Sequence, residues 1–350
     1  MSVALFGLIL FLSPFYLLES GLPQPFHVAG LLLILVNTFR ERFRWFRNIN
    51  PFVGFAVYAA LVNLLVYLRF VDTHTLLSSA YYLFNIALFW ALQNTLANNP
   101  QKALFRAKNI FLALLGFELV LFLSGRGRFY GDVRFMGTLN DPNQLAHWTL
   151  WALIGIIAIE YAIRRQLGSS TLMALLLGGG VLLATASRSG LLGFLMILAA
   201  VSLVYVKDLV RPRILFKFMA MGLGLGLIGS VVLTGLSLGL AGNEATQWSN
   251  KAINQAHFYM DRIKEGILKG TGNLEERGYD RLWKYPEYLI LGAGEGANDR
   301  WAEKSSFLGE IHSSLAGVAF YYGIPGTALL LIGLIRVTQV ATQPSSGSGD

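Results

Sequence analysis

The chain has 350 residues, of which 54% are hydrophobic and only 14% are charged, and its formal net charge is +8. Soluble domains carry about 25% charged residues, so this composition excludes an ordinary soluble domain and indicates a polytopic membrane protein. Cysteine is absent, which excludes disulfides and thiolate metal ligands.

A helix needs about 20 mostly apolar residues to cross the hydrocarbon core of a membrane. On that criterion ten segments are candidates, approximately 3–18, 26–39, 52–70, 75–96, 109–123, 144–163, 171–187, 189–206, 214–240 and 314–335. The first has neither a basic start nor a small-residue cleavage site, so we expect a helix and not a signal peptide. The sequence therefore predicts an all-α polytopic membrane protein with about ten transmembrane helices.

The positions of the basic residues predict the orientation, because cytoplasmic loops carry an excess of Lys and Arg. Fourteen of these residues fall in one set of alternate connections, for example around 40–47 and 207–217. Outside the long loop described next, the other set holds five: Arg69, Arg126, Arg128, Arg134 and Arg188. Both termini are thus expected in the cytoplasm. The positive charge requires no nucleic acid partner, because most basic residues serve as anchors at anionic lipid.

One long hydrophilic stretch, 241–313, interrupts the apolar segments and carries nine basic and eleven acidic residues. We expect four regions: transmembrane helices 1–9 in 1–240, an extracytoplasmic loop at 241–313, a final span in 314–340 and a disordered tail at 341–350. The tail ends in Ser-Ser-Gly-Ser-Gly-Asp, which is typical of a cloning remnant and is not expected to belong to the fold.

A first polar cluster, Arg134 to Asn143, precedes the sixth apolar segment. Asp141 followed by Pro142 is suited to starting a helix, and this is one interpretation of the cluster. In the other, the helix N-terminus and Arg134 form an anion site for a phosphate group.

A second cluster, Ala186-Ser187-Arg188-Ser189-Gly190, is a very short turn between two apolar segments. It holds Arg188 at the outer interface of the membrane, where a buried cation is costly and usually functional. The alternative is an interfacial Arg that reaches lipid phosphate.

The long loop contains two predicted helices. Residues 246–268 place apolar side chains at helical spacing, which predicts an amphipathic helix. Asn273-Leu-Glu-Glu276 has capping-box spacing and predicts a short helix through Trp283. That helix would carry Arg277 and Arg281 on one face, where they bind an anion or are neutralised by Glu276 and Asp280.

The end of the loop supplies two further candidates. Gly292-Ala-Gly294-Glu-Gly296 suggests a flexible turn that forms a backbone anion nest. His312 opens the last apolar segment. A His there is often a cap, and it is also the natural general base near neutral pH. No carboxylate or His spacing typical of a metal site is present, so we expect no metal and no cofactor, and any phosphate must be bound by Arg.

The pattern resembles the O-antigen ligase and O-antigen polymerase superfamily of bacterial membrane glycosyltransferases over about 120–335. The matching pieces are Arg-x-x-Gly-Thr-x-x-Asp-Pro-Asn from Arg134, Ser187-Arg188-Ser189, Arg281-Leu-Trp283, Gly292 to Gly296, His312-Ser-Ser-Leu and Tyr322-Gly-Ile-Pro-Gly326. Two departures are Ser313, where the family commonly has Asn, and a single segment after the loop, where the family has more.

The resemblance implies a fold of the membrane C-type glycosyltransferase kind in the bacterial inner membrane. It implies a metal-independent, inverting transferase whose donor is a glycan on undecaprenyl pyrophosphate. Arg188 and Arg281 would bind the pyrophosphate, His312 would be the base, and Arg277, Arg134, Asn143 and Asp141 would help to bind substrate. The acceptor would be a lipid A core sugar, a growing polysaccharide or a protein hydroxyl. A lipid-linked glycan flippase and a non-catalytic scaffold are the alternatives.

Overall fold

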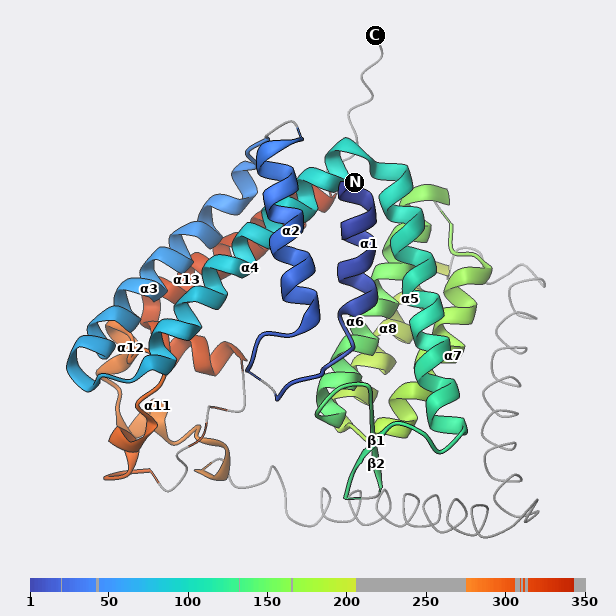
Figure 1. The fold of residues 1–350 in the computed structure, drawn as a ribbon. Helices are drawn as coiled ribbons and strands as arrows, with labels where there is room; N and C mark the ends of the chain where they lie inside the picture. Colours follow the sequence, from blue (N-terminus) through green and yellow to red (C-terminus); the bar gives the residue numbers. More distant parts are fainter. Residues whose placement is uncertain are drawn as a thin grey trace. The chain divides into compact units, whose positions relative to one another are not determined.

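The computed structural model describes residues 1–19, 21–41, 44–131, 133–164, 166–205, 275–305, 309, 311 and 314–342. The chain is mostly helical (Figure 1). Its longer helices are α1 (Ser2–Leu12), α2 (Pro25–Phe39), α3 (Asn50–Phe70), α4 (Thr73–Asn98), α5 (Pro100–Leu123), α6 (Pro142–Arg164), α7 (Ser169–Thr185), α8 (Arg188–Tyr205) and α13 (Ser314–Thr342). Short elements are η1 (Arg47–Ile49), η2 (Glu275–Arg277), α11 (Arg281–Lys284), α12 (Tyr288–Leu291) and η3 (Asn298–Trp301).

Nine of the ten predicted apolar segments lie in the described residues, apart from residue 206 at the end of one, and each contains a helix. The prediction of ten spans is nevertheless wrong. Within the described ranges, four stretches are helical, long and apolar enough to cross a membrane: Arg47–Phe70, Thr73–Asn98, Pro142–Arg164 and Leu315–Gln339. They indicate a multi-pass membrane protein. Helix α1 has 11 residues, which give a length of about 16 Å, roughly half of the hydrocarbon thickness. The predicted span at 214–240 lies outside the described residues.

The expectation of an all-α chain also needs correction, because a short antiparallel ribbon precedes α6. Strands β1 (Arg128–Tyr130) and β2 (Arg134–Gly137) pair Phe129 with Phe135 and Tyr130 with Arg134. Phe135 is fully buried and its ring lies 5.3 Å from that of Phe122 in α5. This packing of Phe135 fixes the position of the neighbouring residue Arg134 in β2.

The chain divides into two units. The first comprises Met1–Leu32 and Thr95–Glu265, and its core forms where α5, α6, α7 and α8 pack together around Leu115, Leu153 and Leu182. Gly178 of α7 lies against Leu153 of α6, where a Cβ would come within 2.8 Å of the Leu side chain. Close packing of this kind relies on small residues, as is usual between membrane helices.

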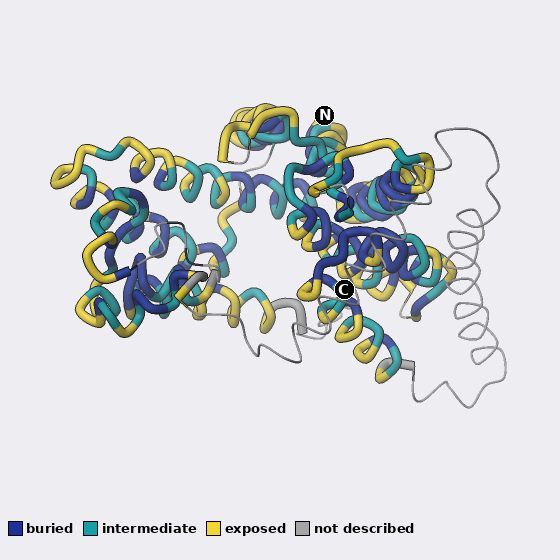
Figure 2. Tube along the Cα trace, turned by 90° about the horizontal axis from the view of Figure 1, so that it is seen from below, coloured by how far each residue is buried: buried dark blue, intermediate teal, exposed yellow. Residues whose placement is uncertain are grey.

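The second unit comprises Leu33–Asn94 and Gly266–Asp350. Helix α13 packs on α3 and α12, and the core is aromatic, with Phe55, Trp301, Phe320 and Tyr322 all buried. The Trp301 and Phe320 rings meet edge to face at 5.1 Å, a favourable geometry for aromatic pairs. Figure 2 shows buried and exposed stretches alternating along the helices, as expected where each presents one face to its neighbours.

The described part of the long loop contains short helical turns instead of the single helix predicted from Asn273 to Trp283. Element η2 ends at Arg277, Gly278 takes a φ of +72°, and α11 begins only at Arg281. Arg277 and Arg281 therefore do not share a helix face: Arg277 is exposed and Arg281 is buried. The predicted amphipathic helix at 246–268 lies outside the described residues.

Candidate functional site

Two sets of predicted site residues occur, one in each unit. In the first unit, the Asn143 side chain joins three chain segments, and we call Arg134, Asn143, Ser187 and Ser189 the Asn143 cluster. Asn143 Oδ1 accepts hydrogen bonds from an Arg134 terminal nitrogen at 3.0 Å and from Ser187 Oγ at 3.0 Å. Ser187 Oγ lies 3.2 Å from Ser189 Oγ. The starts of α6 and α8 thus meet in one hydrogen-bonded cluster.

Local sequence explains why both helices begin here. Asp141 Oδ1 accepts the backbone N–H groups of Asn143 at 2.7 Å and Gln144 at 3.2 Å, so Asp141 caps α6 and Pro142 occupies its first turn. Ala186 takes a left-handed φ of +50° and ends α7, and α8 starts two residues later. The cap predicted from Asp141-Pro142 is present.

Arg134 is the buried member of this cluster and is only 7% exposed. Its Nε donates to the Thr185 carbonyl at 3.2 Å, near the end of α7. One guanidinium therefore ties the ribbon to the end of α7 and to the start of α6, which makes Arg134 a residue that positions the cluster. Arg188, in contrast, is exposed on the first turn of α8.

The sequence did not identify one buried acid, which contacts the turn between β2 and α6. Glu118 of α5 is fully buried, and its carboxyl contacts the Thr138 hydroxyl, which also lies 2.8 Å from the Pro14 carbonyl. A Cβ on Gly137 would collide with the Glu118 carboxyl group. A single Glu in an otherwise apolar stretch was the signal that could have identified it.

In the second unit, Trp301 is the centre of a cluster with two guanidinium groups, and we call Arg281, Arg300, Trp301 and Tyr321 the Trp301 cluster. The guanidinium carbons lie 5.6 Å (Arg281) and 4.2 Å (Arg300) from the ring centroid. Contacts at these distances are cation–π interactions. Trp301 is 1% exposed, so the cluster is an internal feature of the unit.

Arg281 is fully buried and has polar partners on two segments. One terminal nitrogen donates to the Gly309 carbonyl at 2.8 Å, and the other lies 3.4 Å from the Tyr321 hydroxyl. Arg281 therefore links α11 to the segment that directly precedes His312. The neighbouring Asp280, expected to neutralise the arginines, instead lies 3.1 Å from Lys284.

Arg300 was not predicted as a site residue. Its terminal nitrogen donates to the carbonyls of Gly294 at 2.6 Å and Gly296 at 3.3 Å, and burial lowers the pKa of this guanidinium to about 10. No helical or strand pattern in the sequence around Arg300 predicts that its guanidinium stacks on the Trp301 ring.

The sequence suggested that the backbone of Gly292–Gly296 binds an anion. In the structure, most of its N–H groups already donate to other partners. Gly292 donates to the Tyr288 carbonyl, Ala293 to Phe320 at 3.0 Å, Gly294 to Tyr321 at 2.7 Å, and Glu295 to Asn63 Oδ1. Helix α13 is interrupted at Gly323, and Pro325 lacks the N–H that would bond the Tyr321 carbonyl. The glycine segment thus satisfies carbonyls that the broken helix leaves open.

Asp72, between α3 and α4, holds the other end of this segment. Its carboxylate accepts the Ala297 N–H, and that hydrogen bond lowers the pKa of Asp72 below its ordinary value. The His74 N–H at 2.9 Å acts in the same direction. The segment Gly292–Trp301 is therefore docked by backbone, aromatic and charged contacts together.

The predicted site residues fall as follows. Arg134, Asp141, Asn143 and Arg188 lie around the Asn143 cluster, Arg281 lies in the Trp301 cluster, and Arg277 is exposed outside it. His312 lies outside the described residues. In the ranges that the structure covers, no three His, Asp or Glu side chains are grouped as metal ligands would be. No protein family model, curated protein or solved structure matches this chain.

Proposed function

We propose that this chain is an inverting membrane glycosyltransferase of the O-antigen ligase or polymerase type. It would move a glycan from undecaprenyl pyrophosphate to an acceptor hydroxyl, either on a lipid A core sugar or on a growing polysaccharide. The reaction would take place at the outer face of the bacterial inner membrane, with both chain termini in the cytoplasm.

The observation that carries the proposal is the meeting of motif residues that are distant in the sequence. Asn143, which ends the Arg134–Asn143 motif, bonds to Ser187, which begins Ser187-Arg188-Ser189. In the second unit, Gly292 of one motif contacts the backbone beside Gly323 of another, where a Cβ on Gly323 would come within 2.7 Å of the Gly292 nitrogen. These contacts join motifs on which the resemblance rests.

The proposed reaction has a simple balance. The acceptor oxygen attacks the anomeric carbon, the bond from that carbon to the pyrophosphate oxygen breaks, and the configuration inverts. The hydroxyl proton passes to His312, which acts as general base, and the electron pair leaves with undecaprenyl pyrophosphate. The protein must therefore stabilise growing negative charge on the leaving group.

Arg188 is the residue that we assign to the leaving group, because it is exposed and stands on the first turn of α8. A guanidinium binds phosphate oxygens in a bidentate manner, and a helix N-terminus favours the same charge. Arg134, Asn143 and Asp141 support that position through their hydrogen bonds. Arg277 is exposed and would contact the donor only peripherally.

Arg281 receives a different role. Because its guanidinium is buried against Gly309 and Tyr321, we assign it to positioning the segment that leads to His312. It would then affect the rate of proton removal more than donor binding.

The two roles separate in kinetics. Arg188→Ala should raise the KM for lipid-linked donor and lower kcat, with kcat/KM falling by about 10²- to 10³-fold, as for loss of one transition-state donor. Arg281→Ala should lower kcat with little change in the donor KM, and Arg281→Lys should restore little because the planar fork is lost. Arg126→Ala, which removes an exposed Arg after α5, is the control. Unchanged transfer in Arg188→Ala would refute the assignment.

A flippase for lipid-linked glycans is the second candidate, and the interruption of α13 at Gly323 favours it, since transporters commonly use broken helices. Reconstituted protein distinguishes the two: a flippase moves the intact donor across the bilayer, whereas a transferase releases undecaprenyl pyrophosphate. A protein hydroxyl as acceptor would give the same release with a glycosylated polypeptide as product.

A further inference from the structure

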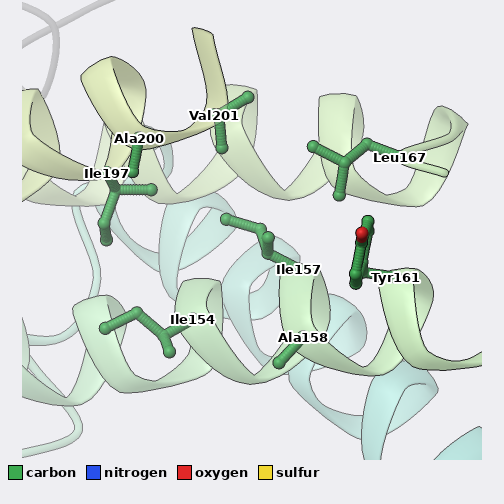
Figure 3. Close-up of a pocket in the computed structure, with 8 residues that line it drawn as sticks. All are labelled: Ile154, Ile157, Ala158, Tyr161, Leu167, Ile197, Ala200 and Val201. Atoms are coloured by element: carbon green, nitrogen blue, oxygen red, sulfur yellow. The ribbon is translucent and has the colours of Figure 1, made fainter. Parts of the chain in front are cut away.

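An open groove with a volume of about 320 Å³ lies between α6 and α8 in the first unit. Figure 3 shows side chains from α6, from α8 and from Leu167 around this space. The residues that form it are Ile154, Ile157, Ala158, Tyr161, Leu167, Ile197, Ala200 and Val201. This volume is in the range of ligand-binding sites, roughly 300–1,000 Å³.

The groove follows from the spacing of small and large residues on the two helices. Towards the N-terminal ends, Gly190 lies against Ala146 and Gly193 against Leu150, where a Cβ would come within 2.7 Å of the neighbour in both cases. Those contacts bring α6 and α8 together. Further along, Ala158 and Ala200 occupy positions where larger residues would fill the space, so the groove opens in the C-terminal halves.

Water is a poor occupant of this groove. The side chains around it are aliphatic except for Tyr161, and a bound water needs two to four polar partners. Helix α6 is one of the candidate membrane spans, so an open groove along it would face hydrocarbon in a bilayer. A hydrocarbon chain matches both the lining and the surroundings.

Charged residues stand at the end of α6, beside the groove. Arg164 lies 3.7 Å from Glu160, and its side chain is 52% exposed. A Cβ on Gly168 would lie 3.3 Å from the Arg164 guanidinium, and Gly168 directly follows Leu167 of the groove. Lys108 of α5 donates to Ser170 at 3.2 Å. Two cations against one carboxylate leave a positive balance, which suits a phosphate group.

We propose that this groove binds an anionic phospholipid, with one acyl chain between α6 and α8 and the phosphate at Arg164. The site is separate from the Asn143 cluster, and the inference does not depend on the proposed transferase activity. Oε2 of Glu160 accepts the Thr171 N–H and hydroxyl, both at 2.7 Å, whereas Arg164 faces Oε1. The exposed half of the Arg164 side chain is the part that would contact the headgroup.

Native mass spectrometry of the purified full chain tests the proposal, with phosphatidylglycerol and phosphatidylcholine of identical acyl chains as probes. The wild-type protein should retain phosphatidylglycerol about fivefold better, the contribution of roughly one basic residue at an anionic headgroup. Arg164→Gln should remove this preference, and Arg164→Lys should keep it. These two variants report on the headgroup.

Ala200→Phe reports on the acyl chain. It adds a ring at an exposed position in the groove, so the fold should persist while binding of both lipids falls. Leu195→Phe is the matched control, because Leu195 is exposed on α8 but does not line the groove. Equal retention by Ala200→Phe and Leu195→Phe would overturn the site. Equal binding of both lipids to wild type would overturn the headgroup assignment.

Discussion

Gly323 and Gly292 allow two backbones to touch where α13 is interrupted. Gly323 has a φ of +59°, and a Cβ there would lie 2.7 Å from the Gly292 nitrogen and from the Ile290 carbonyl oxygen. With a ψ of −163°, Gly323 occupies a region that is essentially restricted to glycine, which costs another residue about 1–3 kcal/mol, and the close contacts add to that. Gly323→Ala should therefore destabilise the second unit by at least this amount, measured as a lower midpoint of thermal unfolding in detergent.

Gly317 supplies the control within the same helix. A Cβ there would meet only the Tyr321 ring at 3.7 and 3.8 Å, which is ordinary contact. Gly317→Ala should be neutral or stabilising by up to about 1 kcal/mol, because Ala favours the helix over Gly. If the Gly323→Ala protein were as stable as the Gly317→Ala protein, the fold would not require glycine at position 323.

At the level of single residues, the sequence predicted what depends on neighbours in the chain. Asp141-Pro142 identified the start of α6, because a cap acts over two or three residues. The prediction that Arg277 and Arg281 share a helix face was wrong, because Gly278 breaks the helix between them. The prediction of an anion nest was wrong because the N–H groups of Ala293 and Gly294 donate to the carbonyls of Phe320 and Tyr321. No local sequence pattern reveals these partners.

Among the elements, the docked segment Gly292–Trp301 should respond to pH through Asp72. Hydrogen bonds from Ala297 and His74 lower the pKa of Asp72 in the folded state, below an unfolded value of about 3.9. The stabilisation is therefore complete above the unfolded value and is lost as the pH falls through the folded one. The segment should stay docked at neutral pH and loosen in acid.

Asp72→Asn tests this effect by thermal unfolding at a series of pH values. The unfolding midpoint of the variant should lie below that of wild type at pH 7, and the difference should shrink as the pH falls below about 4. Asp299→Asn controls for the removal of one exposed acid from the docked segment. A difference between Asp72→Asn and wild type that is the same at every pH would contradict a role for the charge.

The helices could be predicted because each is a long apolar run, whereas the shorter features could not. Helix α1 ends at Leu12, just before Pro14, and not near residue 18. The ribbon of three- and four-residue strands was missed, since strands this short give no clear alternation. The ribbon matters to the site because β2 carries Arg134.

For the whole molecule, the membrane class followed from composition, but the number of spans did not. Helices α1, α2, α7 and α8 are apolar yet have only 11, 15, 17 and 18 residues, and apolarity alone does not separate a span from a helix covered by its neighbours. The candidate site shows the same limit: the sequence identified Asn143 and Ser187 as parts of two motifs, whereas their hydrogen bond depends on the packing of α6 against α8.

The central claim, that this chain transfers a glycan from a lipid pyrophosphate, is tested most directly by product analysis with the purified full chain. The protein would be given an undecaprenyl-pyrophosphate-linked glycan and a hydroxyl acceptor in detergent. We predict one undecaprenyl pyrophosphate released for each glycan transferred, inversion at the anomeric carbon, and the same rate when a metal chelator is added. A donor that remains intact in the presence of each acceptor class, or a product with retained configuration, would contradict the claim.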